Sequence, residues 1–389
     1  MMIASVPRIS VVMPAYNAAA TIESALASIQ AQSVRDIVII VVNDGSTDAT
    51  REIVERLAAA DPRIRVLNQA NGGIVDALNA GLALCTTELV ARHDADDLAL
   101  PDRFEKQVTY LQAHPDCVAV SGAVRHIDND GRLLKAKATL PSPDLSDPGH
   151  FPQIEPYLIH PFLMVRCAAI EEVGGYRYVF HAEDTDLYWR LQDMGRLFNM
   201  PDILGDYRIH AGSISGVSVV NGRVSAMNSQ RAGISALRRR RGRPDIAFPK
   251  SFLGEYEAAR SLEGMLRVAS RGLDEDESGI LALSAGLKLL ESAAYRPYEV
   301  ETEDCVFIRS ALERSGRSIR RSNRALCERM ISGAAARLIQ HGKTSSAIQL
   351  LPPALYPAMA VRLLLRVAMP KMARKMIQKA VGRDSTLTK

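Results

Sequence analysis

Three carboxylates in four positions make Asp94-Ala-Asp-Asp97 the most informative stretch of the sequence. Like charges at this spacing repel one another unless a cation lies among them. Oxygen ligands at this density suit Mg²⁺ or Mn²⁺ better than zinc. The structural alternative is that the aspartates cap a turn or a helix. The stretch predicts a divalent-cation site, of the kind that a diphosphate leaving group requires.

The elements that must position these carboxylates alternate between strand and helix over the first 130 residues. Strand patterns cover residues 9–13, 37–42, 65–67 and 89–91, and helical patterns cover residues 25–29, 53–57 and 74–84. This order predicts an α/β fold with a largely parallel sheet and helices on both faces. Ligands of such sheets bind where the strands end. Asn17, Asp44 and Asp94 each follow a strand, so we expect them in one crevice.

Helical patterns dominate from about residue 226, and strand patterns nearly vanish there. We therefore expect two domains, residues 1–220 and 221–389, in agreement with the length of 389 residues. No run of eighteen uncharged apolar residues predicts a spanning helix. The N-terminus lacks the basic start of a secretory signal. Five cysteines without metal-type spacing favour free thiols in a reducing cytoplasm.

Charge is distributed unevenly along the chain, although the net charge is only +4. From residue 309 to the end, 17 basic residues stand against three acidic ones. Residues 355–381 place apolar side chains among lysines and arginines, in a pattern that Pro370 interrupts. Basic amphipathic helices lie on anionic membrane surfaces or pack on partners. Two interpretations stay open: the tail binds such a membrane, or it packs against the acidic body of the chain itself.

Five motifs in order resemble a known family. They are Pro14-Ala-Tyr-Asn17, Val42-Asn-Asp-Gly-Ser-Thr-Asp48, Asn71-Gly-Gly73 with Ala77-Leu-Asn79, Asp94-Ala-Asp-Asp97 and His181-Ala-Glu-Asp-Thr-Asp186. Together they resemble the inverting family 2 glycosyltransferases with the GT-A fold, over residues 8–215. The resemblance implies a Rossmann-like domain with a mostly parallel central sheet that binds a nucleotide sugar, usually a UDP-sugar. An α-helical C-terminal domain is expected to follow it.

The resemblance also implies roles for single residues on the donor side. Asp44 is expected to accept a hydrogen bond from the base, with an Asx turn to Ser46 as the structural alternative. Leu78 stands where many relatives have arginine, so no cationic contact is expected there. The full set of expected donor-binding residues is Pro14, Ala15, Tyr16, Asn17, Asp44, Gly72, Gly73, Asn79, Arg92 and Asp94.

Metal, base and acceptor roles follow from the same resemblance. Asp96 and His210 are the expected metal ligands, with Asp97 behind them. Asp184 matches the general base that takes the proton of the acceptor hydroxyl, and Asp186 is the next candidate. An acidic first turn that complements the helix dipole is the structural alternative. The expected acceptor-binding residues are His160, Glu183 and Trp189, although His160 also suits a packed loop histidine.

The sequence supports neither an NAD enzyme nor a nucleotidyltransferase. An NAD enzyme would need G-x-G-x-x-G after the first strand, and a nucleotidyltransferase would usually have a Gly-rich loop with lysine there. Both motifs are absent. The remaining alternative is an inactive binding or scaffold protein. The expected partners are a UDP-sugar and a glycan or lipid-linked acceptor, without nucleic acid, for cell-surface polysaccharide or lipopolysaccharide. The expected location is cytoplasmic, or peripheral on the inner face of the cell membrane.

Overall fold

The computed structural model describes residues 8–209, 218–315 and 321–361, and these form two compact units. Of the described residues, unit 1 takes 8–148, 154–209 and 236–243, and unit 2 takes 149–153, 218–235, 244–315 and 321–361. The helix that crosses residue 220 therefore contributes to both units, and the predicted boundary between residues 220 and 221 stays a prediction.

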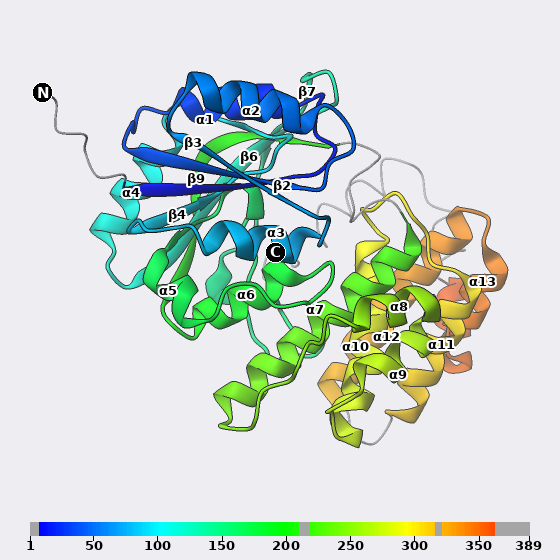
Figure 1. The fold of residues 1–389 in the computed structure, drawn as a ribbon. Helices are drawn as coiled ribbons and strands as arrows, with labels where there is room; N and C mark the ends of the chain where they lie inside the picture. Colours follow the sequence, from blue (N-terminus) through cyan, green and yellow to red (C-terminus); the bar gives the residue numbers. More distant parts are fainter. Residues whose placement is uncertain (1–7, 210–217, 316–320, 362–389) are drawn as a thin grey trace, which may run out of the picture. The chain divides into compact units, whose positions relative to one another are not determined.

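Unit 1 is built on one nine-stranded sheet (Figure 1). Its strands are β1 (Ile9–Ala15), β2 (Ile37–Asp44), β3 (Ile64–Gln69), β4 (Leu89–Arg92), β5 (Leu98–Ala99), β6 (Cys117–Ile127), β7 (Leu133–Ala138), β8 (Met164–Arg166) and β9 (Arg196–Arg208). Their order is β3-β2-β1-β4-β8-β6-β9-β5, with β7 also paired to β6. The predicted strands β1 to β4 are parallel. Beyond them the sheet is mixed, because β8 runs antiparallel to both β4 and β6.

The sheet is buried on both faces, which explains the uninterrupted apolar run of β2. Alternate side chains of a strand point to opposite faces. Ile37, Ile39 and Val41 join one hydrophobic cluster, and Val38 and Ile40 join the other. A strand with two apolar faces shows no alternation in sequence, as is usual for parallel sheets covered by helices.

Helices cover the two faces of the sheet in unit 1 (Figure 1). One cluster receives α1 (Ile22–Gln30), α2 (Thr50–Ala60) and α4 (Arg103–Ala113), and the other receives α3 (Ile74–Leu82), α5 (Cys167–Glu172) and α6 (Glu183–Gln192). Two 3₁₀ turns, η1 (Pro143–Leu145) and η2 (His160–Phe162), lie in the connections. This layering agrees with the predicted helices on both faces.

The carboxyl ends of β1 to β4 lie at one edge of the sheet. Ala15 pairs with Asn43, Asp44 pairs with Gln69, and Arg92 pairs with Val12. The loops that follow these strands therefore leave from the same edge. The expectation that Asn17, Asp44 and Asp94 gather there is met at the level of the backbone.

The described residues of unit 2 form helices and the segments that connect them, without a strand. Its elements are α7 (Val219–Arg240), α8 (Phe252–Ala259), α9 (Leu262–Ala269), α10 (Glu275–Ser292), α11 (Thr302–Arg314), α12 (Arg321–Gln340), α13 (Thr344–Leu350) and η3 (Pro353–Leu355), although the last turn of α7 belongs to unit 1. A capping box between Asp274 and Glu277 begins α10. In the part of the chain that the structure describes, no helix is long and apolar enough to cross a membrane.

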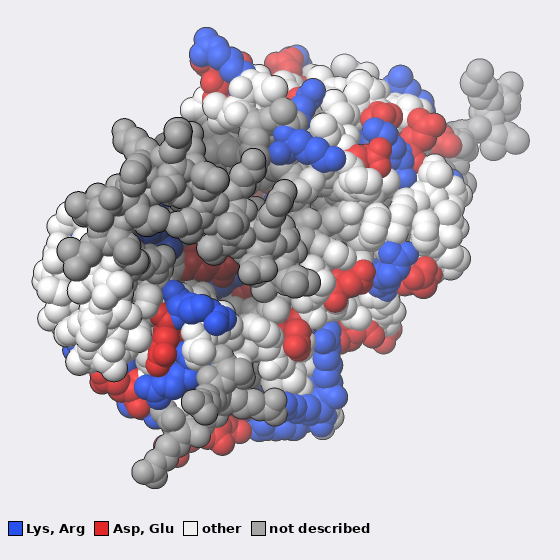
Figure 2. All heavy atoms as spheres, turned by 180° about the vertical axis from the view of Figure 1, so that it is seen from behind, with Lys and Arg blue, Asp and Glu red and all other residues white. Residues whose placement is uncertain are grey.

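Charged side chains of both signs are interspersed on the face drawn in Figure 2. Most of the basic tail predicted at residues 355–381 lies outside the described residues, which end at Val361. Both interpretations of the tail therefore stay predictions. All five cysteines are buried and free, as the sequence indicated.

Candidate active site

The segment after β1 is tied to the loop after β2. Pro14 and Ala15 are buried in the strand itself, which runs past the predicted end at Met13, and the Tyr16 side chain that follows is 53% exposed. Asn17 adopts a left-handed backbone with φ of 50°. Its N–H donates to Ser46 Oγ over 3.0 Å, and its Oδ1 accepts from the Thr47 N–H over 2.8 Å.

Asp44 shapes the loop of residues 71–73, which we call the donor loop. One carboxylate oxygen of Asp44 accepts from the Gly72 N–H and the other from the Gly73 N–H, each over 2.9 Å. Gly73 has φ of 86° and is the N-cap of α3, so a side chain there would strain the backbone. The turn with Ser46 belongs to the neighbouring Asn43, whose Oδ1 accepts from the Ser46 N–H. A contact of Asp44 with a base stays a prediction.

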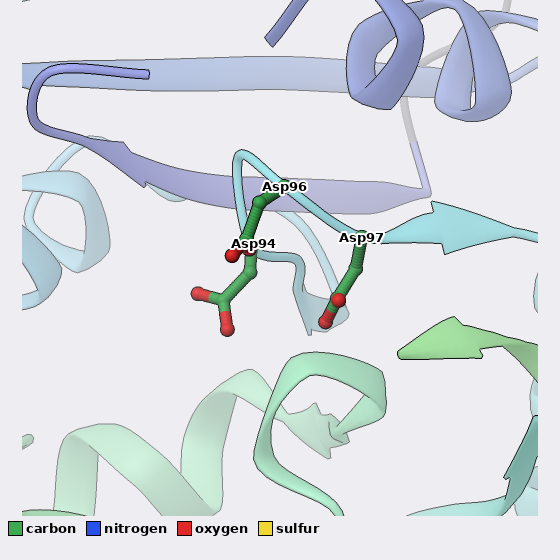
Figure 3. A group of neighbouring side chains, drawn as sticks. All are labelled: Asp94, Asp96 and Asp97. Carbon is green, nitrogen blue, oxygen red and sulfur yellow. The ribbon is translucent and has the colours of Figure 1, made fainter. Parts of the chain in front are cut away.

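Asp94, Asp96 and Asp97, which we call the aspartate loop, converge as a possible ligand set between β4 and β5 (Figure 3). One oxygen from each carboxylate lies within 4.8 Å of the other two. Asp97 Oδ1 accepts from the Arg208 N–H over 2.7 Å, whereas the buried Asp97 Oδ2 has no hydrogen-bond partner. An orphaned carboxylate oxygen in an all-oxygen set fits Mg²⁺ or Mn²⁺.

The electrostatics of the aspartate loop agree with this fit. Burial and the charges of Asp94 and Asp96 hold the pKa of Asp97 well above its ordinary value. Arg92 forms an ion pair with Asp94. Its buried Nε and Nη1 have no hydrogen-bond partner, which leaves donors of the guanidinium available to a ligand.

A buried network that sequence reasoning missed supports the aspartate loop from behind. Arg103 is fully buried, and its Nη2 donates to the Arg92 carbonyl over 2.7 Å. Its Nη1 donates to His93 Nδ1 over 3.0 Å, so the proton of that neutral ring lies on Nε2, which faces the Asp97 carbonyl. Gln107 accepts from Arg103 Nε. A signal was present in the sequence, because Arg103 and Gln107 interrupt the apolar face of α4 at i and i+4.

Glu183 and Asp184 stand on the first turn of α6. Burial and the adjacent Asp184 raise the pKa of Glu183 to about 7. Burial also raises the pKa of Asp184, while the Thr185 N–H and the charge of Arg92 oppose that rise. The charge of Arg92 also lowers the pKa of Glu183. Arg92 is thus electrostatically linked to the aspartate loop and to the helix that carries the predicted base.

Asp186, the second candidate for the base, has a structural role. Its carboxylate is fully buried and forms ion pairs with Arg177 and Arg190. Although burial favours the neutral acid, Arg190 and Arg177 hold the pKa of Asp186 below its ordinary value. A carboxylate held by two guanidinium groups is a poor proton acceptor, so Asp184 stays the preferred candidate.

His160 lies beside two buried tyrosines. Its Nε2 is 2.7 Å from the Tyr176 hydroxyl, and its ring packs edge-on to Tyr188. Burial and the charge of Arg92 keep the pKa of His160 well below its ordinary value, so the ring is neutral at physiological pH. The Tyr188 hydroxyl is buried without a partner. Burial raises the pKa of both tyrosines, and the charges of Asp184 and Glu183 raise it further.

The structure does not leave every predicted residue available to a ligand. The Asn79 amide is occupied by the backbone of Tyr176. Trp189 is fully buried beneath the guanidinium of Arg240, which lies 5.3 Å from its ring centre. A tryptophan buried in this way offers no surface to an acceptor, so its placement does not support the predicted contact. His210 lies outside the described residues, and its role as a metal ligand stays a prediction.

Comparison with known proteins shows which family the sequence matches. The sequence model of glycosyl transferase family 2 matches residues 10–174. The amylovoran biosynthesis glycosyltransferase AmsE of Erwinia amylovora is 32% identical over 208 residues, which cover 52% of this chain and 76% of that protein. The O-antigen biosynthesis glycosyltransferase WbnJ of Escherichia coli is 29% identical over 211 residues, 52% of this chain and 80% of that protein.

Among solved structures, a mannosyltransferase from Pyrobaculum calidifontis in complex with GDP-Man and Mn²⁺ is similar at 21% identity. Its TM-score is 0.49, over 92% of this chain and 87% of that one. The sequence relatives are the stronger finding, because one of them exceeds 30% identity over three quarters of its own length. The chain therefore belongs to the family 2 glycosyltransferases, with the GT-A fold that the motifs indicated.

Proposed function

We propose that this glycosyltransferase transfers a hexosyl or N-acetylhexosaminyl group from a UDP-sugar to a hydroxyl of a glycan or lipid-linked acceptor, with inversion. The observation that carries the proposal is the position of Arg92. It pairs with Asp94 of the aspartate loop, and its charge acts on both Glu183 and Asp184. Groups suited to a leaving diphosphate and to an incoming hydroxyl are thus linked through one side chain.

The chain's own residues divide the reaction between them. Asp184 takes the proton of the acceptor hydroxyl as its oxygen attacks the anomeric carbon. The bond from that carbon to the diphosphate breaks, and the nucleoside diphosphate leaves with the bonding electrons. Asp96 was expected from the sequence to hold the metal, with Asp94 at the donor and Asp97 behind, but all three carboxylates converge. Together they would hold Mn²⁺ or Mg²⁺, which would supply charge neutralisation for the leaving diphosphate. Arg92 adds a fixed positive charge beside them.

The relatives suggest the biological product. AmsE acts in amylovoran biosynthesis and WbnJ in O-antigen biosynthesis, as their names state. We propose that this chain likewise builds a cell-surface polysaccharide or lipopolysaccharide. A lipid-linked acceptor would place it at the inner face of the cell membrane. Sedimentation with anionic vesicles tests that location. Vesicle binding that does not weaken as the salt concentration rises would contradict a contact driven by charge.

A screen of nucleotide sugars tests the function. We expect UDP-sugars to raise the melting temperature in the presence of Mn²⁺ and much less with EDTA. The stabilising donor is then assayed for release of UDP, to water and to candidate glycans. An inactive binding protein would be stabilised by the donor without releasing UDP, and that result would favour the scaffold alternative. Stabilisation by GDP-sugars alone would overturn the UDP assignment.

A further inference from the structure

The turn of residues 173–176, between α5 and α6, is fastened to the helix that follows the donor loop. Asn79 of α3 holds Tyr176 through two hydrogen bonds. Its Nδ2 donates to the Tyr176 carbonyl and its Oδ1 accepts from the Tyr176 N–H, each over 2.9 Å. The two residues are 97 positions apart in the chain. A side-chain amide that satisfies both groups of one residue fixes its backbone closely.

The same turn is fastened to the helix that carries the predicted base. Arg190 of α6 donates through Nη1 to the carbonyls of Val173 and Gly175, each over 2.7 Å. Asp186 holds Arg190 in place through its Nε over 2.8 Å. The turn therefore joins α3 to α6, and these helices begin at the donor loop and at Glu183 respectively.

The Tyr176 side chain extends from this turn to His160. It is 5% exposed, and its hydroxyl hydrogen-bonds to His160 Nε2. The rings of Tyr176 and His160 lie 5.5 Å apart between centroids. Because the hydroxyl engages one ring nitrogen, it restricts both the orientation and the tautomer of His160.

We propose that Tyr176 is a positioning residue that couples the donor loop to the acceptor side of the site, through Asn79 on one side and His160 on the other. This inference rests on the proposed function. Asp44 accepts from the N–H of Gly73, the donor-loop residue that is the N-cap of α3, and Asn79 lies on the same helix. A shift of the donor loop therefore moves Asn79 with the helix. A nucleotide that orders the loop thereby orders Tyr176 and His160. Tyr176 itself touches neither donor nor acceptor in this proposal.

Nuclear magnetic resonance of the full chain with ¹⁵N-labelled histidine tests the coupling directly. His160→Gln identifies the ring signals of His160, and UDP with diamagnetic Mg²⁺ is the probe. We expect UDP to shift the His160 signals in the wild type. In Tyr176→Phe the shift should fall by at least about half, while the calorimetric Kd of UDP stays within about threefold. Equal shifts in both proteins would overturn the proposal.

Kinetics supply a second readout that a purely structural role would not move. Tyr176→Phe should lower kcat of transfer about tenfold with little change in the donor KM. In a double-mutant cycle with His160→Gln, the two losses should not add. Full additivity would overturn the coupling. Tyr110→Phe on α4 is the matched control, because it also removes a tyrosine hydroxyl with one hydrogen bond, which it accepts from Arg196 Nη1 over 2.9 Å.

A second variant keeps the test decisive if Tyr176→Phe does not fold. Asn79→Asp retains an acceptor for the Tyr176 N–H and loses the donor to its carbonyl. We expect it to reduce the UDP-induced shift of His160 as well, and an unchanged shift would overturn the proposal. Failure of the proposed function looks different, because the wild type would then neither bind UDP nor release it from a UDP-sugar.

Discussion

Two stretches of this chain each carry three acidic residues in four positions, and the fold uses them differently. The aspartate loop brings Asp94, Asp96 and Asp97 together within 4.8 Å. On the first turn of α6, Asp186 turns inward to two arginines, while Glu183 and Asp184 remain half-buried near the charge of Arg92.

Backbone conformation accounts for the difference. Successive side chains of a helix diverge by about 100°, so a helical turn spreads three carboxylates over different surroundings. A loop between two strands has no such constraint and can aim them at one point. Equal composition thus yields a converging set of carboxylates in one place, and in the other the proposed base next to a structural ion pair.

Asp184→Asn should produce the largest effect. The amide keeps the shape of the side chain but cannot accept the acceptor's proton, so transfer should fall by about 10²–10⁴-fold. UDP binding in Mn²⁺ should stay within a few-fold of wild type, because the proposed base acts on the acceptor and has no proposed contact with the donor. Steady-state rates and calorimetry measure the two quantities. Weakened donor binding with a preserved rate at saturation would move Asp184 to the donor side.

Asp186→Asn should instead affect stability. Removal of one partner from a buried ion pair leaves the remaining charge uncompensated and costs about 3–5 kcal/mol. Urea unfolding measures the loss. Asp116→Asn is the matched control, because it breaks an Asp–Arg pair with Arg196 at the surface, where such pairs contribute about 0–1 kcal/mol. Similar losses in the two variants would contradict the structural role of Asp186.

Asp96→Ala should abolish stabilisation by metal. At 100 times its Kd, a ligand specific for the folded state adds about 2.7 kcal/mol. Mn²⁺ with UDP should therefore raise the melting temperature of the wild type but not that of the variant. Without metal, the variant should be at least as stable as the wild type, because one of three like charges is gone. Asp130→Ala, on an exposed turn, should respond to Mn²⁺ as the wild type does.

Patterns local in sequence predicted much of the first unit. The apolar run of β2 and the spacing of the helices gave the positions of β1 to β4, because burial on both faces leaves a direct trace in composition. The family and the GT-A fold were also predicted from the motifs, and the comparisons confirm them. Asp94, Asp96 and Asp97 were named because like charges at this spacing repel one another unless a cation lies among them, and Asp184 was named from the resemblance to the family.

Contacts between distant segments could not be predicted in this way. Nothing near Asn79 in the sequence indicates that its amide binds Tyr176. Trp189 looked like an acceptor contact because it follows the acidic motif, but the helical rotation between positions 184 and 189 buries it. The antiparallel placement of β8 depends on its partners, and a strand of three residues carries little pattern of its own.

The pH dependence of the free energy of unfolding tests the protonation of Glu183 on the first turn of α6. Glu183 has an ordinary pKa of 4.5, and burial beside Asp184 raises its pKa in the folded protein to about 7. Between these values the folded state holds a proton that the unfolded state has released. The free energy of unfolding must therefore fall as pH rises from about 4.5 to about 7.

Glu183→Gln removes this titration and should remove its part of the fall. One pKa unit corresponds to about 1.4 kcal/mol, and the shift is shared with Asp184, so we expect the variant to gain on the order of 1–2 kcal/mol over the wild type across this range. Urea unfolding in EDTA at several pH values measures the difference, and Glu52→Gln on the exposed face of α2 is the control. Parallel curves for Glu183→Gln and the wild type would mean that Glu183 is ionised in the folded protein. Glu183 and Asp184 would then both carry a negative charge in the folded protein, opposed by the charge of Arg92 and by the helix dipole.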